Sequence, residues 1–351
     1  MASYLRAQAT EFLRALRLHR ETGGGSPARA DTRGGAASGA EGAVDAVRAL
    51  RRSARRISGS LHTFRPLLDP AWSEEMRPEL AWLSGTLGLE HACEARLRRL
   101  LLALQRLSGS GSTVFPAPSV NSTAVAGAAR SADSGPPVQA GPERGNLTVG
   151  AAKAGALLER QLTLARTRAH STALQALGSA RFHAVADRVA VLASEVPLTP
   201  AAATTDLRPL AAAAEERLTN AIATLPLLTA GHPYNAEALI HGLSPDPSPH
   251  PQDGPWHQVR LLLRLHRYAR EVLHGDADRV DVRLLAAGQA LNRHRDASEA
   301  AAAAAQAART PRIAPATAYA LGVLHADQRL EVEAARFAFQ QSWLKQPVSA
   351  P

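Results

Sequence analysis

The sequence is poor in cysteine, in long apolar runs and in aromatic residues, and each shortage excludes a class of protein. Cys93 is the only cysteine, so no disulfide can form within the chain, and we expect a reducing compartment, the cytoplasm. No apolar run approaches the roughly 18 residues of a membrane-spanning helix, so we expect no membrane span. Aromatic residues make up 4% of the chain, too few for a β-sandwich or a β-barrel.

Lysine is also scarce, because arginine supplies almost all of the positive charge. Lys153 and Lys345 are the only lysines among 40 basic residues, which face 31 acidic residues and give a formal net charge of +9. A guanidinium group keeps its charge and presents a planar fork of donors that suits phosphate or carboxylate. The surplus therefore predicts a polyanionic partner.

Stretches rich in alanine, leucine and arginine, which are good helix formers, predict an all-α fold. The expected helices cover residues 3–21, 43–66, 71–107, 151–177, 180–195, 205–228, 255–274, 280–309 and 314–345, with a break in 71–107 near Gly85 or Gly88. Gly-, Ser- and Pro-rich composition predicts disordered linkers over 22–42 and 108–149.

A helix over residues 43–66 would carry its arginines on one face. Five of them fall within an arc of roughly 140° on the helical wheel: Arg48, Arg51, Arg52, Arg55 and Arg56. No acidic residue between positions 48 and 65 offsets the repulsion among them. A face that binds a polyanion explains this pattern, because bound phosphate would remove the repulsion. The alternative is an arginine-rich helix face exposed to solvent.

A second basic stripe runs along the expected helix over residues 255–274. Four side chains form it: His257, Arg260, Arg264 and Arg267. The stripe is about 15 Å long, which suits an extended chain of phosphates. Its first three residues have the same spacing as Arg48, Arg51 and Arg55, which indicates an internal duplication.

The two helices resemble the motifs of the conserved histidine α-helical domain (CHAD) family. Residues 255–268 resemble the motif of the family's second half, and Leu291, Asn292 and Asp296 resemble the Leu-Gly…Asp that follows it. In the first half, Arg51, Arg55 and Arg56 resemble the arginines of the family's motif. Residues 64–68 and 82–88 resemble the next landmarks.

The first half departs from the family pattern at several positions. Arg48 stands where the family has its first histidine, Ser58 stands where the last arginine of the motif belongs, and His91-Ala92 replaces an Arg-Asp pair. We therefore expect the first half to bind phosphate more weakly than the second half, or in a different geometry.

The resemblance implies a fold of two pseudo-symmetric four-helix bundles, here residues 1–197 and 205–345. It also implies that inorganic polyphosphate binds to basic side chains between the bundles, in some relatives at polyphosphate granules. The nine ligands expected here are His257, Arg260, Arg264, Arg267, Arg48, Arg51, Arg52, Arg55 and Arg56. The Glu-x-Glu-x-Lys motif of the triphosphate-tunnel domain that many relatives carry is missing, so we expect a binding protein rather than an enzyme, with no catalytic residue, metal or cofactor. The oligomeric state stays open.

Two other functions stay open. The charge permits RNA or DNA binding, although few aromatic side chains are present for base stacking and no known nucleic-acid motif occurs. A metal-dependent phosphohydrolase is the less favoured alternative, because no carboxylate cluster accompanies the nearby histidines His232, His241, His250, His257 and His266. A nucleophilic role for Cys93 is less favoured still, because its apolar neighbours indicate packing.

Overall fold

The computed structural model describes residues 1–23, 33–109, 142–232, 243, 250–275 and 281–344. Within these ranges the chain forms helices and contains no β-strand, which confirms the all-α class. Among the described residues, short 3₁₀ turns connect helices at η2 (Arg65–Leu67), η3 (Pro200–Ala203) and η4 (Pro251–Asp253).

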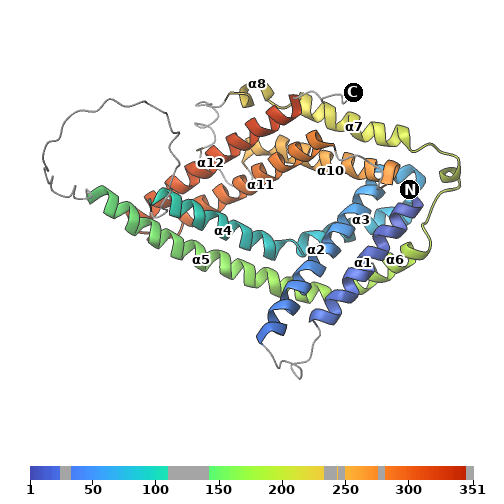
Figure 1. Cartoon of the computed structure of the whole chain (residues 1–351), viewed down its shortest axis with the longest axis horizontal. Helices are drawn as coiled ribbons and strands as arrows, with labels where there is room; N and C mark the ends of the chain where they lie inside the picture. The colour runs from blue at the N-terminus through green and yellow to red at the C-terminus, as the bar shows by residue number, and fades with distance from the viewer. Residues whose placement is uncertain (24–32, 110–141, 233–242, 244–249, 276–280, 345–351) are drawn as a thin grey trace, which may run out of the picture.

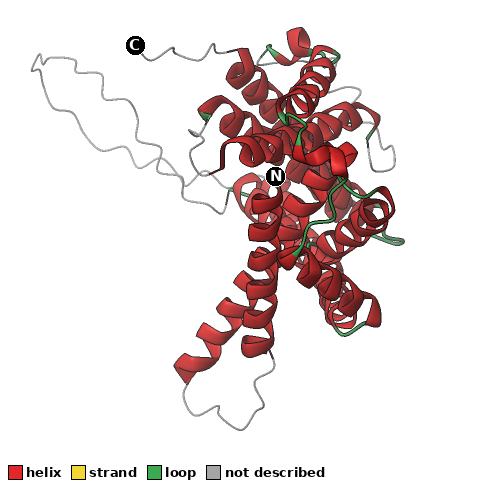
Figure 2. Cartoon of the chain, turned by 90° about the vertical axis from the view of Figure 1, so that its right-hand side faces the viewer, coloured by secondary structure: helices red, strands yellow, loops and turns green. Residues whose placement is uncertain are grey.

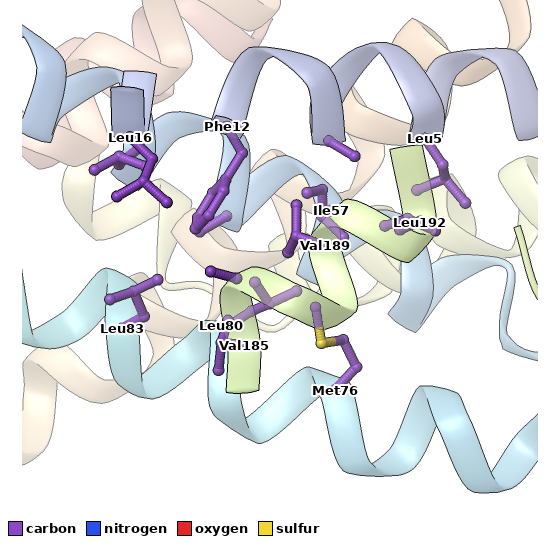
Figure 3. Packing of buried hydrophobic residues seen from close by; sticks show 14 of the residues in the cluster. Leu5, Phe12, Leu16, Ile57, Met76, Leu80, Leu83, Val185, Val189 and Leu192 are labelled. Atoms are coloured by element: carbon purple, nitrogen blue, oxygen red, sulfur yellow. The ribbon is translucent and has the colours of Figure 1, made fainter. Parts of the chain in front are cut away.

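The first core is built by helices from the N-terminal half. Four helices share it: α1 (Ala2–Gly23), α2 (Arg33–Thr63), α3 (Pro70–Thr86) and α6 (Ala180–Ser194). Each contributes apolar side chains at helical spacing, including Phe12, Ile57, Leu80 and Val189 (Figure 3). Burial of these side chains fixes which face of α2 points inward and leaves its arginines on the other face.

The second core belongs to the C-terminal half. It is formed mainly by α7 (Arg208–Ala223), α10 (Gly254–His274), α11 (Val282–Ala308) and α12 (Pro315–Leu344), with the short α8 (Leu227–Ala230) at its edge. Trp256, Val259, Leu291 and Phe339 are fully buried in it. The apolar side of α10 faces this core, so the basic stripe of α10 faces the other half of the chain.

A third core joins the two halves. Helices α4 (Leu89–Leu107) and α5 (Pro142–Leu177) pack there against α11 and α12, through residues such as Leu104, Leu158, Ala304 and Leu324. In Figure 1 the α4–α5 pair and the α11–α12 pair converge at one end of the molecule. Both of the halves predicted over residues 1–197 and 205–345 therefore contribute side chains to this third core.

The predicted linkers are partly helical. Helix α2 begins at Arg33 and α5 begins at Pro142, so residues 33–42 and 142–149 belong to helices although composition assigns them to linkers. The packed remainder of each helix lets the helix propagate outward, and in the first stretch Ala36, Ala37 and Ala40 also favour helix. The end of α1 and the start of α2 project from the body of the molecule (Figure 2). The rest of the predicted linkers, residues 24–32 and 110–141, lies outside the described residues.

Candidate functional site

The two basic helices α2 and α10 pack against each other at a glycine. A Cβ atom at Gly59 would lie 2.5 Å from Cδ2 of Tyr268, so only glycine lets the helices approach this closely. A second glycine, Gly88, leaves room for the guanidinium of Arg51, because a Cβ placed there would clash with it. Gly59 thus lets α2 pack closely on α10, and Gly88 leaves space for Arg51 beside the start of α4.

Five half-buried arginines from three helices form what we call the central basic cluster. Its members are Arg51 and Arg55 of α2, Arg260 and Arg264 of α10, and Arg295 of α11. Burial, and then the charges of the other arginines, lowers the pKa of Arg55 to about 10 and that of Arg260 to about 9. The same two causes lower the pKa of Arg51 and of Arg264. The cluster therefore holds an uncompensated positive charge.

The guanidiniums of the cluster differ in how many hydrogen bonds and ion pairs they form within the protein. The Nε atom of Arg51 donates to the carbonyl oxygen of Ser84 at 3.1 Å, and Nε of Arg260 donates to Oδ1 of Asn292 at 2.8 Å. In the described part of the chain, Arg55 and Arg264 form no ion pair, and Nε of Arg264 is buried without a hydrogen-bond partner. These two side chains keep their donors available for an anion.

Arg295 is the member with acidic partners. Its guanidinium donates to Asp296, and its Nε lies 3.7 Å from Oε1 of Glu299. Glu299 also accepts from Arg96 of α4 at 2.7 Å. Arg295 could not be predicted from the basic stripes, since it lies on a helix with few other arginines and reaches the cluster only through the packing of α11 on α10.

Four of the eight arginines expected as ligands lie outside the cluster. Arg48 is exposed and pairs with Asp45 at 3.2 Å, and Arg52 is exposed. Nε of Arg56 donates to Oε2 of Glu271 at 2.8 Å, and Tyr4 donates to the same oxygen at 2.8 Å.

The fourth side chain outside the cluster is Arg267. It is exposed and lines a different hollow of about 890 Å³, which also contains Arg56 and Tyr4. The structure thus brings together Arg51, Arg55, Arg260 and Arg264 of the expected ligands.

His257 lies one turn before Arg260 on the same stripe. The residue is half-buried, and its Nε2 atom is buried without a hydrogen-bond partner in the described part of the chain. Burial is the main cause that lowers the pKa of His257, so the imidazole is neutral at pH 7. Nε2 can therefore act as a neutral donor or acceptor toward a bound group.

Behind His257 lies a buried network that the sequence analysis missed. Asp253 is fully buried, and its carboxylate accepts from Arg329 at 2.8 Å, Arg336 at 2.8 Å and Ser298 at 2.7 Å, with His294 at 3.4 Å. Burial alone would raise the pKa of Asp253, but hydrogen bonds from His294 and Arg329 outweigh burial and leave that pKa well below its usual range.

This network ties the start of α10 to α11 and α12. The rings of His294 and Trp256 stack at 5.6 Å, and His257 meets His294 edge-on at 5.5 Å. The sequence signal was weak, because Asp253 follows a Pro-rich stretch and its partners lie 41 and more positions away.

Two hollows adjoin the central basic cluster. The α3 hollow, of about 690 Å³, lies between α2, α3 and α10 and is lined by Arg55 and Arg264. The α4 hollow, of about 210 Å³, lies between α2, α4 and α11 and is lined by Arg51 and Arg295. A linear anion bound to the cluster can therefore extend into either hollow.

The described residues contain no group of three or more His, Cys, Asp or Glu side chains placed to hold a metal ion. Of the histidines considered for this role, His266 is buried in α10, His250 accepts at Nδ1 from the backbone N–H of Gln252, and His241 lies outside the described residues. Cys93 is a half-buried free thiol. In the part of the chain that the structure describes, no helix is long and apolar enough to span a membrane.

Comparison with known proteins identifies the family. The model of the CHAD domain matches residues 34–305. The chain belongs to the CHAD family. Among solved structures, this CHAD protein is similar to PptA from Streptomyces chartreusis, with 66% sequence identity, a TM-score of 0.75 and 98% of each chain covered. No match was found among curated proteins.

Proposed function

We propose that this CHAD protein binds inorganic polyphosphate at the central basic cluster. The observation that carries the proposal is the pair Arg55 and Arg264, which contribute charge and hydrogen-bond donors but have no acidic partner among the described residues. A half-buried charge without a counter-ion costs folding free energy, and a bound anion removes that cost. Membership of the CHAD family supports polyphosphate as this anion.

A linear phosphate chain fits the shape of the site. Two hollows adjoin the cluster, so one chain can contact arginines of α2, α10 and α11 in succession. Guanidinium forks bind adjacent phosphoryl oxygens in bidentate fashion. His257 would hydrogen-bond the chain at the N-terminal end of the α10 stripe.

We propose binding without turnover. Guanidiniums stay protonated at physiological pH and neither supply nor remove a proton in a reaction. A binding protein of this kind would associate with polyphosphate in the cytoplasm, including at granules where the polymer is concentrated.

The test is a calorimetric titration of the full chain with long-chain polyphosphate and with tRNA, at low and moderate salt. The double variant Arg260→Ala/Arg264→Ala should weaken polyphosphate binding by roughly 100-fold, because two charge-assisted contacts are lost. The matched control Arg48→Ala/Arg52→Ala removes the same charge from exposed positions of α2 and should change affinity by less than about threefold. Equal losses in the two variants would overturn the proposed site, and equal affinity for tRNA would favour nucleic-acid binding.

A further inference from the structure

The α3 hollow is lined by apolar as well as basic side chains, whereas the central basic cluster that it adjoins consists of arginines. The residues that line the hollow come from α2, α3 and α10. Its volume of about 690 Å³ lies within the range of pockets that hold small organic ligands. The hollow therefore has room for more than a chain of phosphates.

The inner end of the α3 hollow is cationic. Arg55 and Arg264 reach it from α2 and α10, and neither forms an ion pair within the described residues. The buried Nε of Arg264 lacks a hydrogen-bond partner, so a donor inside the site remains unused. Two or three linked phosphates would satisfy both guanidiniums.

Apolar side chains form much of the remaining wall of the hollow, beside the polar His62, Glu74 and Arg77. Leu261 lies on the basic side of α10 with 43% of its surface exposed, and Pro78 and Ala81 of α3 face it as exposed residues. The half-buried ring of Tyr268 and the buried Leu265 complete the wall. Inorganic polyphosphate has no apolar surface to place against such a wall, whereas a nucleoside has.

We propose that the α3 hollow binds a nucleoside polyphosphate, such as a nucleoside triphosphate. The phosphates lie against Arg55 and Arg264, and the nucleoside lies against Leu261, Ala81 and the ring of Tyr268. The hydroxyl of Ser58 supplies a polar contact for the sugar or the base, beside Glu74, whose carboxylate pairs with Arg65 at 2.8 Å and with Arg77 at 3.1 Å. The site shares two arginines with the polyphosphate site but does not require that polyphosphate bind.

Because Arg55 and Arg264 serve both ligands, the nucleotide and the polymer exclude each other. Each should reduce the apparent affinity for the other without a change of fold. The protein would then release polyphosphate as nucleotide concentration rises.

The experiment compares ATP, GTP and inorganic tripolyphosphate, which carry equal numbers of phosphates, in titrations of the full chain. Ala81→Trp fills the apolar part of the hollow from an exposed position and leaves the arginines in place. It should weaken ATP and GTP binding by roughly tenfold, the effect of losing about 60 Å² of apolar contact, and leave tripolyphosphate within twofold. The control is Ala71→Trp on the same helix, at an exposed position that does not line the hollow, and it should leave all three affinities unchanged.

A second variant, Leu261→Ser, repeats the test from α10 and should again weaken nucleotide binding alone. Thermal unfolding of each variant checks that the fold is intact. Failure of ATP and GTP to bind, or equal losses for nucleotide and tripolyphosphate in Ala81→Trp, would overturn the nucleotide site. Binding of nucleotides without any binding of long-chain polyphosphate would overturn the proposed function and leave this site standing.

Discussion

The protein gathers arginines in two places, and the two differ in counter-charge. In the buried network, Arg329 and Arg336 meet the fully buried Asp253 at hydrogen-bond distance. In the central basic cluster, Arg55 and Arg264 meet mainly other arginines. Arginine paired inside the protein stabilises the packing of helices, whereas arginine held together without acids stores a repulsion that an external anion relieves. The presence or absence of an acidic partner therefore distinguishes the arginines that stabilise the fold from the arginines proposed to bind an anion.

The largest expected effect comes from removing the counter-charge of the network. Asp253→Ala leaves Arg329 and Arg336 buried without their carboxylate and should lower the free energy of unfolding by about 3–5 kcal/mol. Denaturation in urea measures the change. Asp45→Ala, which breaks only the exposed pair with Arg48, should cost less than about 1 kcal/mol. Similar losses in both variants would remove the distinction between the two regions.

The network should also make stability depend on pH. Burial lowers the pKa of His294 to about 4, so the folded protein keeps this imidazole neutral while the unfolded chain binds a proton below pH 6.5. The free energy of unfolding should therefore fall as the pH drops, by about 2 kcal/mol between pH 7 and pH 5. Burial lowers the pKa of His257 and of His266 as well, which acts in the same direction.

Urea midpoints at the two pH values give the measurement. His294→Gln should flatten the dependence, whereas His183→Gln at an exposed position should preserve it. A parent protein that is equally stable at pH 5 and pH 7 would contradict a buried neutral His294.

In the central basic cluster, removing an arginine should have the opposite effect on stability. Arg55→Met keeps much of the side chain's volume, removes one repelling charge and should raise the free energy of unfolding by about 1 kcal/mol at low salt. The gain should shrink at high salt, because screening weakens the repulsion. A loss of stability in thermal unfolding would mean that Arg55 has a compensating partner.

The smallest expected effect comes from the acids at the edge of the cluster. Glu299 pairs with Arg96 and lies near Arg295, so it competes with a bound anion for these guanidiniums. Glu299→Gln should raise polyphosphate affinity about threefold. Glu94→Gln, which affects only the exposed pair with Arg98 on α4, serves as the control. Weaker binding in Glu299→Gln would indicate that Glu299 positions Arg96 for the ligand.

Hydrophobic periodicity and composition were sufficient to predict most of the helices from the sequence. The helix ranges follow from local patterns, and the expected break near Gly88 is present, since α3 ends at Thr86 and Gly88 is the N-cap of α4. Composition predicts a linker over residues 33–42 and 142–149, whereas the adjoining packed helix favours continuation of the helix into each stretch.

The site could be predicted only in part, because pairing depends on residues distant in sequence. Arg55 and Arg56 look equivalent on the helical wheel, yet only Arg56 reaches Glu271, 215 positions along the chain. Arg295 joins the cluster through the packing of α11, and Asp253 acts from the start of α10. Such partners are set by tertiary contacts that no local pattern contains.

The most direct test compares Arg55→Ala with Arg56→Ala in titrations with long-chain polyphosphate. The two residues are neighbours on α2, and each variant removes one positive charge. Arg55→Ala, which removes an unpaired guanidinium, should weaken polyphosphate binding roughly tenfold. Arg56→Ala should weaken it by less than about threefold, because Arg56 is paired with Glu271, which also accepts from Tyr4. Equal losses, or a larger loss in Arg56→Ala, would contradict the conclusion that missing counter-charge marks the binding site.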